Sequence, residues 1–435
     1  MRRVPVFIPV VCLFFLTGSC LSPERVQFTG IQKSPVLTGG NPWDVDLDFL
    51  ALNRGYAEIR SALSDKAAPG AAILLAKDGK VIRRHAFGYA RLYGERIQSD
   101  DTEPSYTKQH IRMLTTTVFD LASLTKMVAT TTSILILMEQ GKIDLDEPVF
   151  RYLPEFGEAG KERVTVRHLL THTSGLPAGL DLYRLCDRPS KVFPMICDQE
   201  LDAPPGYQRI YSDLGFIILG ILVEEVAGQS LDRFARQNIF EPLGMRDTCF
   251  CPSPRMRLRC AATEYSSLHE RFLVGEVHDE NAYKMGGVAG HAGLFSTVDD
   301  LAVFCQMILN GGAYGNTRIL RSDTVQLMLT PQLAPEILER GSGFLRGREQ
   351  LIGWWQMGAK PEITSSGGLP SKSAFGHSGF TGTTIWIDPE QQLFAILLTN
   401  AVHPSRNTCD RGRVRRAFYG SVWRAMGIEP PEVAE

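Results

Sequence analysis

Hydrophobic residues recur three and four positions apart in several separate stretches of the chain. These stretches cover about residues 46–64, 123–140, 213–228, 230–240 and 299–310. Such spacing places the apolar side chains on one face of a helix. We therefore expect a helix in each stretch, and a final helix that starts near Arg413.

Short apolar runs of a different kind lie near both ends of the chain. Two surround Lys77–Lys80, which contains an Asp-Gly pair, and two surround Asp388–Glu390. An Asp-Gly pair between apolar runs is typical of a β-hairpin. Strands from both ends bury their faces well only in a shared sheet. The predicted fold is α/β, in the α+β sense. It has one antiparallel sheet flanked by helices, with a mostly helical subdomain inserted at roughly 127–290.

The N-terminus has the pattern of an export signal. Arg2 and Arg3 precede an apolar stretch, 4–16, and small residues lead to Cys20. The apolar stretch is shorter than the ~20 residues that a membrane-spanning helix needs, and it suits a signal peptide. We predict a signal peptide at 1–19, lipidation of Cys20, a tether at 20–45 and a folded domain at 46–430. The protein would then be periplasmic and held on the membrane. The alternative is an uncleaved signal anchor with an unmodified Cys20.

Charge and cysteine content bear on three possibilities: nucleic-acid binding, disulfide bonds and a zinc site. Lys plus Arg number 46 and Asp plus Glu 48, so no basic excess favours nucleic acid. In an oxidising compartment, Cys186 with Cys197, or Cys260 with Cys249 or Cys251, are candidate disulfides. An odd number of cysteines follows the export segment, so at least one stays free or pairs between chains. No cysteine spacing is typical of zinc.

Ser123 and Lys126 form an S-x-x-K pattern at the start of a predicted apolar helix. Three-residue spacing places both side chains on one helical face. A neighbouring amine activates a serine hydroxyl by accepting its proton. Ser105 and Lys108 match the same pattern, but in a polar stretch with no apolar helix behind it. We therefore favour Ser123 as the nucleophile; the alternative for Ser123 is a simple helix cap.

Two further motifs follow in order: Tyr211-Ser212-Asp213, and His377-Ser378-Gly379 with Phe380 after it. With Ser123 and Lys126 they resemble the S-x-x-K, Y-x-N and K-T-G motifs of the serine β-lactamase and penicillin-binding protein superfamily. The resemblance covers roughly 50–425, on the class C β-lactamase and D-alanyl-D-alanine carboxypeptidase branch. It includes "VTVRHLLTHTSGLP" and "IFEPLGMRDT". "VHDENAYKMGGVAGHAGLF" is most similar to the penicillin-binding protein 4B group.

The resemblance implies a role for each motif. Ser123 would form an acyl-enzyme, while Lys126 and Tyr211 move protons. The backbone N–H groups of Ser123 and Phe380 would form an oxyanion hole. His377, Ser378 and Gly379 would line the substrate strand and contact a carboxylate, and Asp213 and Phe380 complete the predicted substrate-binding set.

The implied activity is a serine-type D-alanyl-D-alanine carboxypeptidase that trims peptidoglycan stem peptides. It would use no metal or cofactor and would bind β-lactams covalently. An esterase for small acyl substrates and a β-lactamase are alternatives that use the same serine. A penicillin-sensing or cell-wall-binding module is the non-enzyme alternative.

Several residues depart from the pattern or allow a second interpretation. Asp213 replaces the usual Asn, and a carboxylate near Lys126 favours the charged amine, which cannot act as a base. His377 replaces the usual Lys, so it offers little charge at neutral pH. His168 and His172 have the spacing of metal ligands but lack the Glu of a metalloprotease, which favours packing. His278 precedes a Gly-rich loop and His291 lies inside it, and the stretch is a candidate for a substrate-side role.

Overall fold

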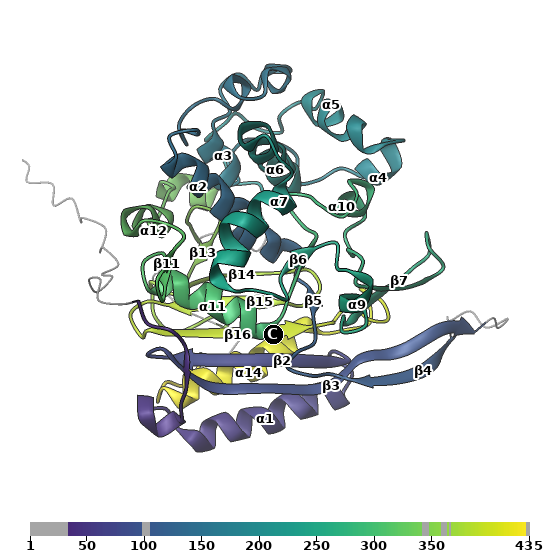
Figure 1. Cartoon of the computed structure of the whole chain (residues 1–435), viewed down its shortest axis with the longest axis vertical. Coiled ribbons are helices and arrows are strands. Elements are labelled where there is room, and N and C mark those ends of the chain that lie inside the picture. The colour runs from purple at the N-terminus through teal and green to yellow at the C-terminus, as the bar shows by residue number, and fades with distance from the viewer. Residues whose placement is uncertain (1–33, 98–104, 342–347, 358–362, 365–366, 432–435) are drawn as a thin grey trace, which may run out of the picture.

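A computed structural model describes residues 34–97, 105–341, 348–357, 363–364 and 367–431 (Figure 1). The predicted signal peptide, Cys20 and most of the predicted tether lie outside the described residues. Within them, no single helix is long and apolar enough to cross a bilayer. One bent pair, Asp213–Ala227 with Leu231–Leu243, meets the length and composition limits only when its two helices are taken together.

A nine-stranded sheet forms the base of the molecule, in the order β1-β3-β2-β16-β15-β14-β13-β12, with β4 paired to β3. Strand β2 from the N-terminal half pairs with β16 from the C-terminal end, from Ala71 opposite Thr399 to Lys77 opposite Leu393. The predicted sharing of one sheet by both ends is therefore confirmed. All its neighbours are antiparallel except β1 and β3. Its strands are β1 (Thr38–Gly39), β2 (Gly70–Lys77), β3 (Lys80–Ile97), β4 (Ser105–Arg112), β12 (Glu349–Gln350), β13 (Trp355–Gln356), β14 (Phe375–Ser378), β15 (Thr384–Asp388) and β16 (Leu393–Thr399).

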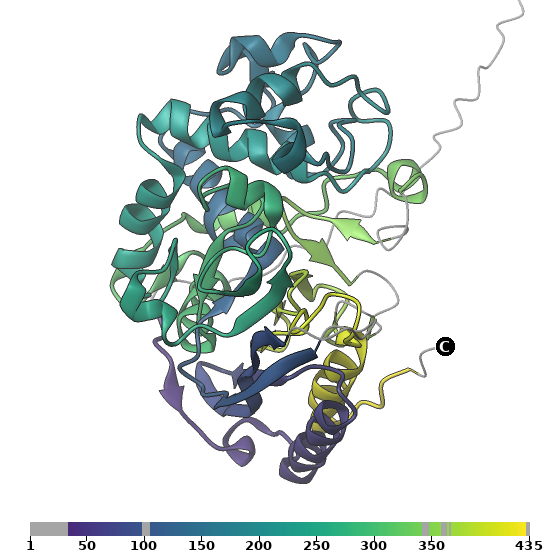
Figure 2. The ribbon, with the colours of Figure 1, turned by 90° about the vertical axis from the view of Figure 1, so that its right-hand side faces the viewer.

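Helices cover both faces of this sheet (Figures 1 and 2). On one face α1 (Phe49–Ser64) packs beside α14 (Arg411–Ala425), and their apolar residues share a core with the sheet. The other face carries α11 (Val298–Leu309) and the helical part of the chain. The remaining longer helices of that part are α2 (Thr132–Glu139), α5 (Val192–Cys197), α6 (Asp213–Ala227) and α12 (Ser322–Met328). This is the predicted arrangement of a sheet flanked by helices.

Shorter elements complete the described chain. The short helices are α3 (Val166–Leu170), α4 (Leu182–Leu185), α7 (Leu231–Ala235), α8 (Glu241–Leu243), α9 (Pro254–Arg257), α10 (Glu280–Lys284) and α13 (Pro335–Glu339). Small sheets are formed by β5 (Phe119–Asp120), β9 (Leu294–Ser296) and β6 (Cys249–Phe250), by β7 (Ala262–Ser266) with β8 (Arg271–Val274), and by β10 (Ala313–Tyr314) with β11 (Thr317–Arg318). The helical insertion predicted at 127–290 therefore also contains strands.

The predicted helix at 123–140 is not one regular helix. It begins as a 3₁₀ turn, η2 (Ala122–Leu124), continues as a π-helical segment, η3 (Lys126–Thr131), and becomes α-helical only in α2. π-Helical turns are rare and occur frequently at functional sites. The wider turn changes the direction of the side chains that follow Ser123.

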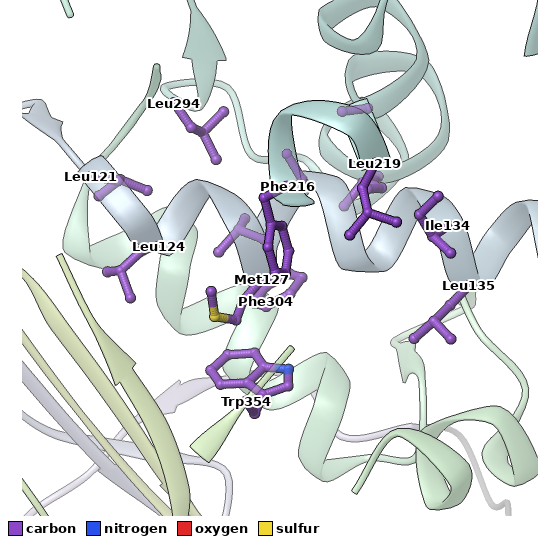
Figure 3. Packing of buried hydrophobic residues seen from close by; sticks show 14 of the residues in the cluster. Leu121, Leu124, Met127, Ile134, Leu135, Phe216, Leu219, Leu294, Phe304 and Trp354 are labelled. Atoms are coloured by element: carbon purple, nitrogen blue, oxygen red, sulfur yellow. The ribbon is translucent and has the colours of Figure 1, made fainter. Parts of the chain in front are cut away.

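The apolar core fixes this irregular segment in place. Leu124 and Met127 pack with Phe216 of α6, Phe304 of α11 and Trp354, all nearly inaccessible to solvent (Figure 3). Burying one such side chain contributes about 1.5–3 kcal/mol. The helical part and the sheet are thus joined at the segment that carries Ser123 and Lys126.

None of the cysteines within the described residues forms a disulfide. The suggested pairs, Cys186 with Cys197 and Cys260 with Cys249 or Cys251, are therefore not present here. Burial raises the thiol pKa of both Cys249 and Cys260 to about 12. A thiol with a raised pKa is a poor source of the thiolate that starts disulfide exchange.

Candidate active site

Ser123 lies in a turn held by hydrogen bonds on both sides. Ala122 has a φ of +47°, a conformation that costs about 1–3 kcal/mol in a residue with a side chain. The Ala122 N–H donates to Asp120 Oδ1 at 2.8 Å, and Thr125 Oγ1 donates to the Ala122 carbonyl at 2.7 Å. These bonds offset the strain. Ser123 remains partly exposed while its neighbours are buried.

The turn after β14 is tied to the same segment. Thr381 Oγ1 donates to the Asp120 carbonyl at 2.8 Å, and Thr383 Oγ1 donates to the Leu121 carbonyl at 3.0 Å. A Cβ on Gly379 would lie 2.3 Å from the Leu121 carbonyl oxygen, so this position requires glycine. The third motif is thereby held beside the first, although they are more than 250 residues apart in sequence.

Lys126 is completely buried and contacts the other predicted catalytic groups. Its Nζ donates to Ser123 Oγ at 2.9 Å and to the His291 carbonyl at 3.2 Å. The same Nζ lies 2.7 Å from Asp213 Oδ1 and is hydrogen-bonded to Tyr211, which is also bonded to Ser123. The structure therefore brings together Ser123, Lys126, Tyr211 and Asp213. Their catalytic roles stay predictions.

The charges of these groups favour a protonated lysine in the resting site. Burial by itself lowers the pKa of Lys126, but the Asp213 carboxylate and Tyr211 outweigh burial, and the net shift is upward. Burial raises the pKa of Tyr211 despite the nearby Lys126 ammonium. Lys126 must lose a proton before it can accept one from Ser123. Asp213, at the start of α6, is the group that opposes this loss.

His377 lies behind this cluster and not on its surface. Its ring is 0% exposed and stacks on Trp355 with ring centroids 3.7 Å apart. Its Nδ1 is 2.9 Å from the Ser378 carbonyl, and its Nε2 has no hydrogen-bond partner among the described residues. Burial, then Lys126, holds the pKa of His377 well below its usual value. The ring is therefore neutral and inaccessible in this structure, so it offers no charge to a substrate carboxylate; its contact with substrate stays a prediction.

Phe380, unlike His377, is exposed to solvent. Its side chain is 46% exposed. Arg411 lies 4.4 Å and Arg406 5.6 Å from the centre of its ring, and His278 stacks on it at 5.8 Å. Arg411 Nη1 also donates to the Phe380 carbonyl at 2.6 Å. Ser378 is partly buried and Gly379 is buried, so Phe380 presents the largest exposed surface of this motif.

The histidines with alternative interpretations have structural contacts. His168 Nδ1 accepts the Thr165 N–H at the start of α3, and His172 Nδ1 accepts the Ser212 N–H at 3.1 Å. The His172 ring also stacks on Tyr211 at 4.5 Å. No cluster of three or more metal-ligating side chains occurs in the part of the chain that the structure describes. His172 therefore supports the tyrosine of the second motif.

Two aspartates that the sequence did not single out support the site from behind. Asp120 accepts N–H groups from Ala122 and from His278, the latter at 2.7 Å. Asp279 accepts a 2.8 Å hydrogen bond from His291, whose carbonyl accepts one from Lys126. Burial raises the pKa of Asp279, but His291 outweighs it and holds the carboxyl well below its usual range. The sequence offered a signal for Asp120 alone, which lies three residues before Ser123. Nothing in the sequence singled out Asp279.

A family model described as beta-lactamase matches residues 57–419. The chain belongs to the β-lactamase family. The protein is a serine hydrolase. Two curated relatives match most of its length. An N-acetylmuramyl-L-alanine amidase of Bacillus subtilis (strain 168) is 34% identical over 393 residues, 82% of this chain and 84% of the relative. A D-alanyl-D-alanine carboxypeptidase-like protein of Escherichia coli (strain K12) is 32% identical over 426 residues, 90% of this chain and 93% of the relative.

Solved structures support the same fold for this β-lactamase-family protein. An octameric penicillin-binding protein homologue from Pyrococcus abyssi aligns with a TM-score of 0.64 and 22% identity, over 87% of this chain and 78% of that one. Simvastatin synthase from Aspergillus terreus aligns with a TM-score of 0.65 and 22% identity, over 87% of this chain and 99% of that one. At this identity the similarity concerns the fold alone.

Replacing His377 with lysine is expected to destabilise the protein. The substitution places an ammonium in a buried site near Lys126 and Arg348, and the Asp213 carboxylate is already paired with Lys126. We expect the free energy of unfolding to fall by about 3 kcal/mol, as for other unpaired buried charges. Urea denaturation measures this value, and His377→Gln, which adds no charge, is the matched control and should lose less. A His377→Lys protein as stable as wild type would show that the side chain reaches solvent.

Proposed function

We propose that this serine hydrolase cleaves an amide bond of peptidoglycan through an acyl-enzyme on Ser123. The observation that carries the proposal is the 2.9 Å hydrogen bond between Lys126 Nζ and Ser123 Oγ, with Tyr211 bonded to both. A hydroxyl held this close to a buried amine is the arrangement that nucleophilic catalysis requires. The names of the two curated relatives, an amidase and a carboxypeptidase-like protein, support peptidoglycan as the source of the amide.

The reaction has two balanced steps. In the first, Ser123 Oγ bonds to the amide carbonyl carbon. Its proton passes through the Tyr211–Lys126 pair to the amine, whose bond to that carbon breaks. In the second, water attacks the acyl carbon and gives a proton to the same pair. That proton returns to Ser123 Oγ as the acid product leaves. The backbone N–H groups of Ser123 and Phe380 are proposed to hold the oxygen that becomes negative in each step.

The burial of His377 bears on which peptidoglycan amide the protein cleaves. A carboxypeptidase must bind the free carboxylate of the leaving D-alanine, but His377 is buried and uncharged. Arg406, beside Phe380, is already paired with Glu264 and Glu280. The amide between N-acetylmuramic acid and L-alanine has no free carboxylate on the leaving residue when the peptide continues. We therefore propose this amide as the first candidate substrate.

The D-alanyl-D-alanine bond is the second candidate, as the sequence motifs imply. The specific observation in its favour is Arg411, whose guanidinium lies 4.4 Å from the exposed Phe380 ring. Covalent reaction of Ser123 with β-lactams belongs to the same proposal, because a β-lactam offers a strained amide to the same hydroxyl.

A substrate comparison tests these proposals. Purified protein is given muramyl dipeptide, a sugar-free pentapeptide ending in D-alanyl-D-alanine, nitrocefin and p-nitrophenyl acetate, and kcat/KM is measured for each. We expect release of L-alanyl-D-isoglutamine from muramyl dipeptide to be the fastest amide hydrolysis. Faster release of D-alanine from the pentapeptide would establish the second candidate. Hydrolysis of the ester alone would contradict both.

We also propose that the protein is exported to the periplasm and tethered to the membrane through lipid on Cys20. The support is the pattern of the first 20 residues, which lie outside the described structure. Cys20→Ser should move the protein from the membrane fraction to the soluble fraction, as measured by immunoblotting of both. If the variant stays in the membrane with its signal segment removed, lipidation of Cys20 is wrong.

A further inference from the structure

A pocket of about 590 Å³ opens near Phe380. Its volume lies in the range of about 300–1,000 Å³ that is typical of small-molecule sites. Its aromatic walls are Tyr183, Tyr265 and Tyr283, and its charged walls include Glu280 and Arg406. None of these residues belongs to the three motifs of Ser123, Tyr211 and His377, although Glu280 and Tyr283 lie in the stretch that begins at Val277.

One lining residue, His278, connects the pocket to the segment that carries Ser123. His278 lines the pocket, and its ring stacks on Phe380 at 5.8 Å with 21° between the planes. The backbone N–H of His278 donates to Asp120, whose other oxygen accepts the Ala122 N–H beside Ser123. A ligand that contacts His278 in the pocket would therefore touch a residue that is itself in contact with Phe380 and bonded to the segment before Ser123.

Ionised groups line the pocket in a fixed, balanced arrangement. Arg406 Nε is 2.6 Å from Glu264 Oε2, and Arg406 Nη2 is 2.5 Å from Glu280 Oε1. His278 Nε2 also lies 2.9 Å from Glu264. Burial raises the pKa of Glu264, but His278 and Arg406 lower it further, to about 2. The pocket thus offers paired carboxylate and guanidinium groups without a cationic excess, which disfavours a strongly anionic ligand.

The remaining surface suits a ring with one apolar face and polar edges. Tyr283 is 37% exposed and its ring contacts His269 at 4.5 Å, so one tyrosine face is supported and the phenol is accessible. Tyrosine combines an apolar face with a polar hydroxyl. A pyranose has C–H groups that pack on such a face and hydroxyls that bond to fixed carboxylate and guanidinium groups. We propose that this pocket binds the N-acetylmuramic acid ring of a peptidoglycan fragment whose amide lies over Ser123.

This inference rests on the proposed function, because it supplies the sugar part of the same substrate. Binding is measured by calorimetry with the Ser123→Ala protein, which cannot turn over. Muramyl dipeptide should bind at least about tenfold more tightly than L-alanyl-D-isoglutamine, which lacks the sugar; one tenfold step corresponds to about 1.4 kcal/mol. Equal affinity for the two probes would overturn the sugar pocket.

The kinetics of pocket variants give a second measurement. It is a ratio of kcat/KM values for two substrates, so loss of folded protein lowers both values and leaves the ratio unchanged. For Tyr283→Ala and Glu280→Gln, the ratio of kcat/KM for muramyl dipeptide to that for p-nitrophenyl acetate should fall at least about tenfold, mainly through KM, the pattern of lost ground-state binding. Tyr283→Phe, which keeps the ring, should restore most of the ratio. Trp43→Ala is the control, because this residue is 67% exposed in η1 (Pro42–Val45), its ring lies 6.3 Å from that of Phe49 in α1, and it does not line the pocket.

The outcomes separate the two proposals. If Ser123→Ala still hydrolyses the amide, the proposed function is wrong, whatever the pocket variants do. If Ser123→Ala is inactive but the pocket variants keep the wild-type ratio, the sugar pocket is wrong and the proposed function stands.

Discussion

Replacing Ser123 with alanine is expected to lower kcat/KM by at least about a thousandfold for ester and amide substrates alike, as loss of a nucleophile does in other serine hydrolases. The substitution removes the atom that forms the acyl-enzyme, while Lys126, Tyr211 and the backbone N–H groups stay in place. Because Ser123 Oγ is bonded to both Lys126 and Tyr211, both lose one contact. Mass spectrometry should also show no covalent adduct after incubation with penicillin.

Ser105→Ala is the matched control, since Ser105 and Lys108 form the other S-x-x-K match. The structure places both in β4 and not in a helix. Ser105→Ala should keep wild-type kcat/KM and wild-type penicillin labelling. Persistent labelling of the Ser123→Ala protein would show that another residue is the nucleophile.

The buried helical character of the segment after Ser123 was within reach of the sequence, while its role as nucleophile stays a prediction. The apolar residues after Ser123 have helical spacing, and Leu124 and Met127 are indeed buried against α6 and α11 (Figure 3). The sharing of one sheet by β2 and β16 also followed from apolar runs at both ends. Both predictions rest on local periodicity, which a buried face imposes directly on the sequence.

The irregular geometry around Ser123 left no comparable signal. The positive φ of Ala122 is stabilised by Asp120, and the same carboxylate accepts the His278 N–H from 158 residues away in sequence. The π-helical turn of η3 likewise depends on tertiary packing, and its sequence has the same spacing as a regular helix.

The burial of His377 could not be predicted for a similar reason. It depends on the ring of Trp355, which comes from the neighbouring strand β13 and stacks on the imidazole. The sequence identified His377 as a third-motif residue with little charge at neutral pH, but its burial required the structure. Asp213 is the opposite case, since its effect on Lys126 followed from the motif and agrees with the 2.7 Å contact.

Asp213→Asn should increase activity at neutral pH. In the wild-type protein, the Asp213 carboxylate helps to hold the pKa of Lys126 above its usual value, so the neutral amine is scarce at pH 7. Asparagine removes the charge with little change of size. Burial lowers the pKa of a lysine, and in the variant the Asp213 charge no longer counteracts it. The pKa of Lys126 therefore falls. An opposite charge at this distance shifts a pKa by about 1–3 units.

The sign of the change follows from the role proposed for Lys126. A group that must be neutral to accept a proton gives an activity that rises with pH up to its pKa. Lowering the pKa of Lys126 therefore moves the rising limb of the profile to lower pH. At pH 7 a shift of about one to three units corresponds to a gain of about tenfold to a thousandfold in kcat/KM.

The measurement is kcat/KM for p-nitrophenyl acetate between about pH 6 and about pH 10, which approaches the reference lysine pKa of about 10.4. Asp232→Asn is the control, because Asp232 lies in the first turn of α7 and forms no ion pair with Lys126. Its profile should match that of the wild type. If Asp213→Asn instead loses activity at every pH while remaining folded, Asp213 takes part in the proton transfers. The ion pair with Lys126 would then be part of the catalytic apparatus, because the carboxylate and the amine would exchange the serine proton between them.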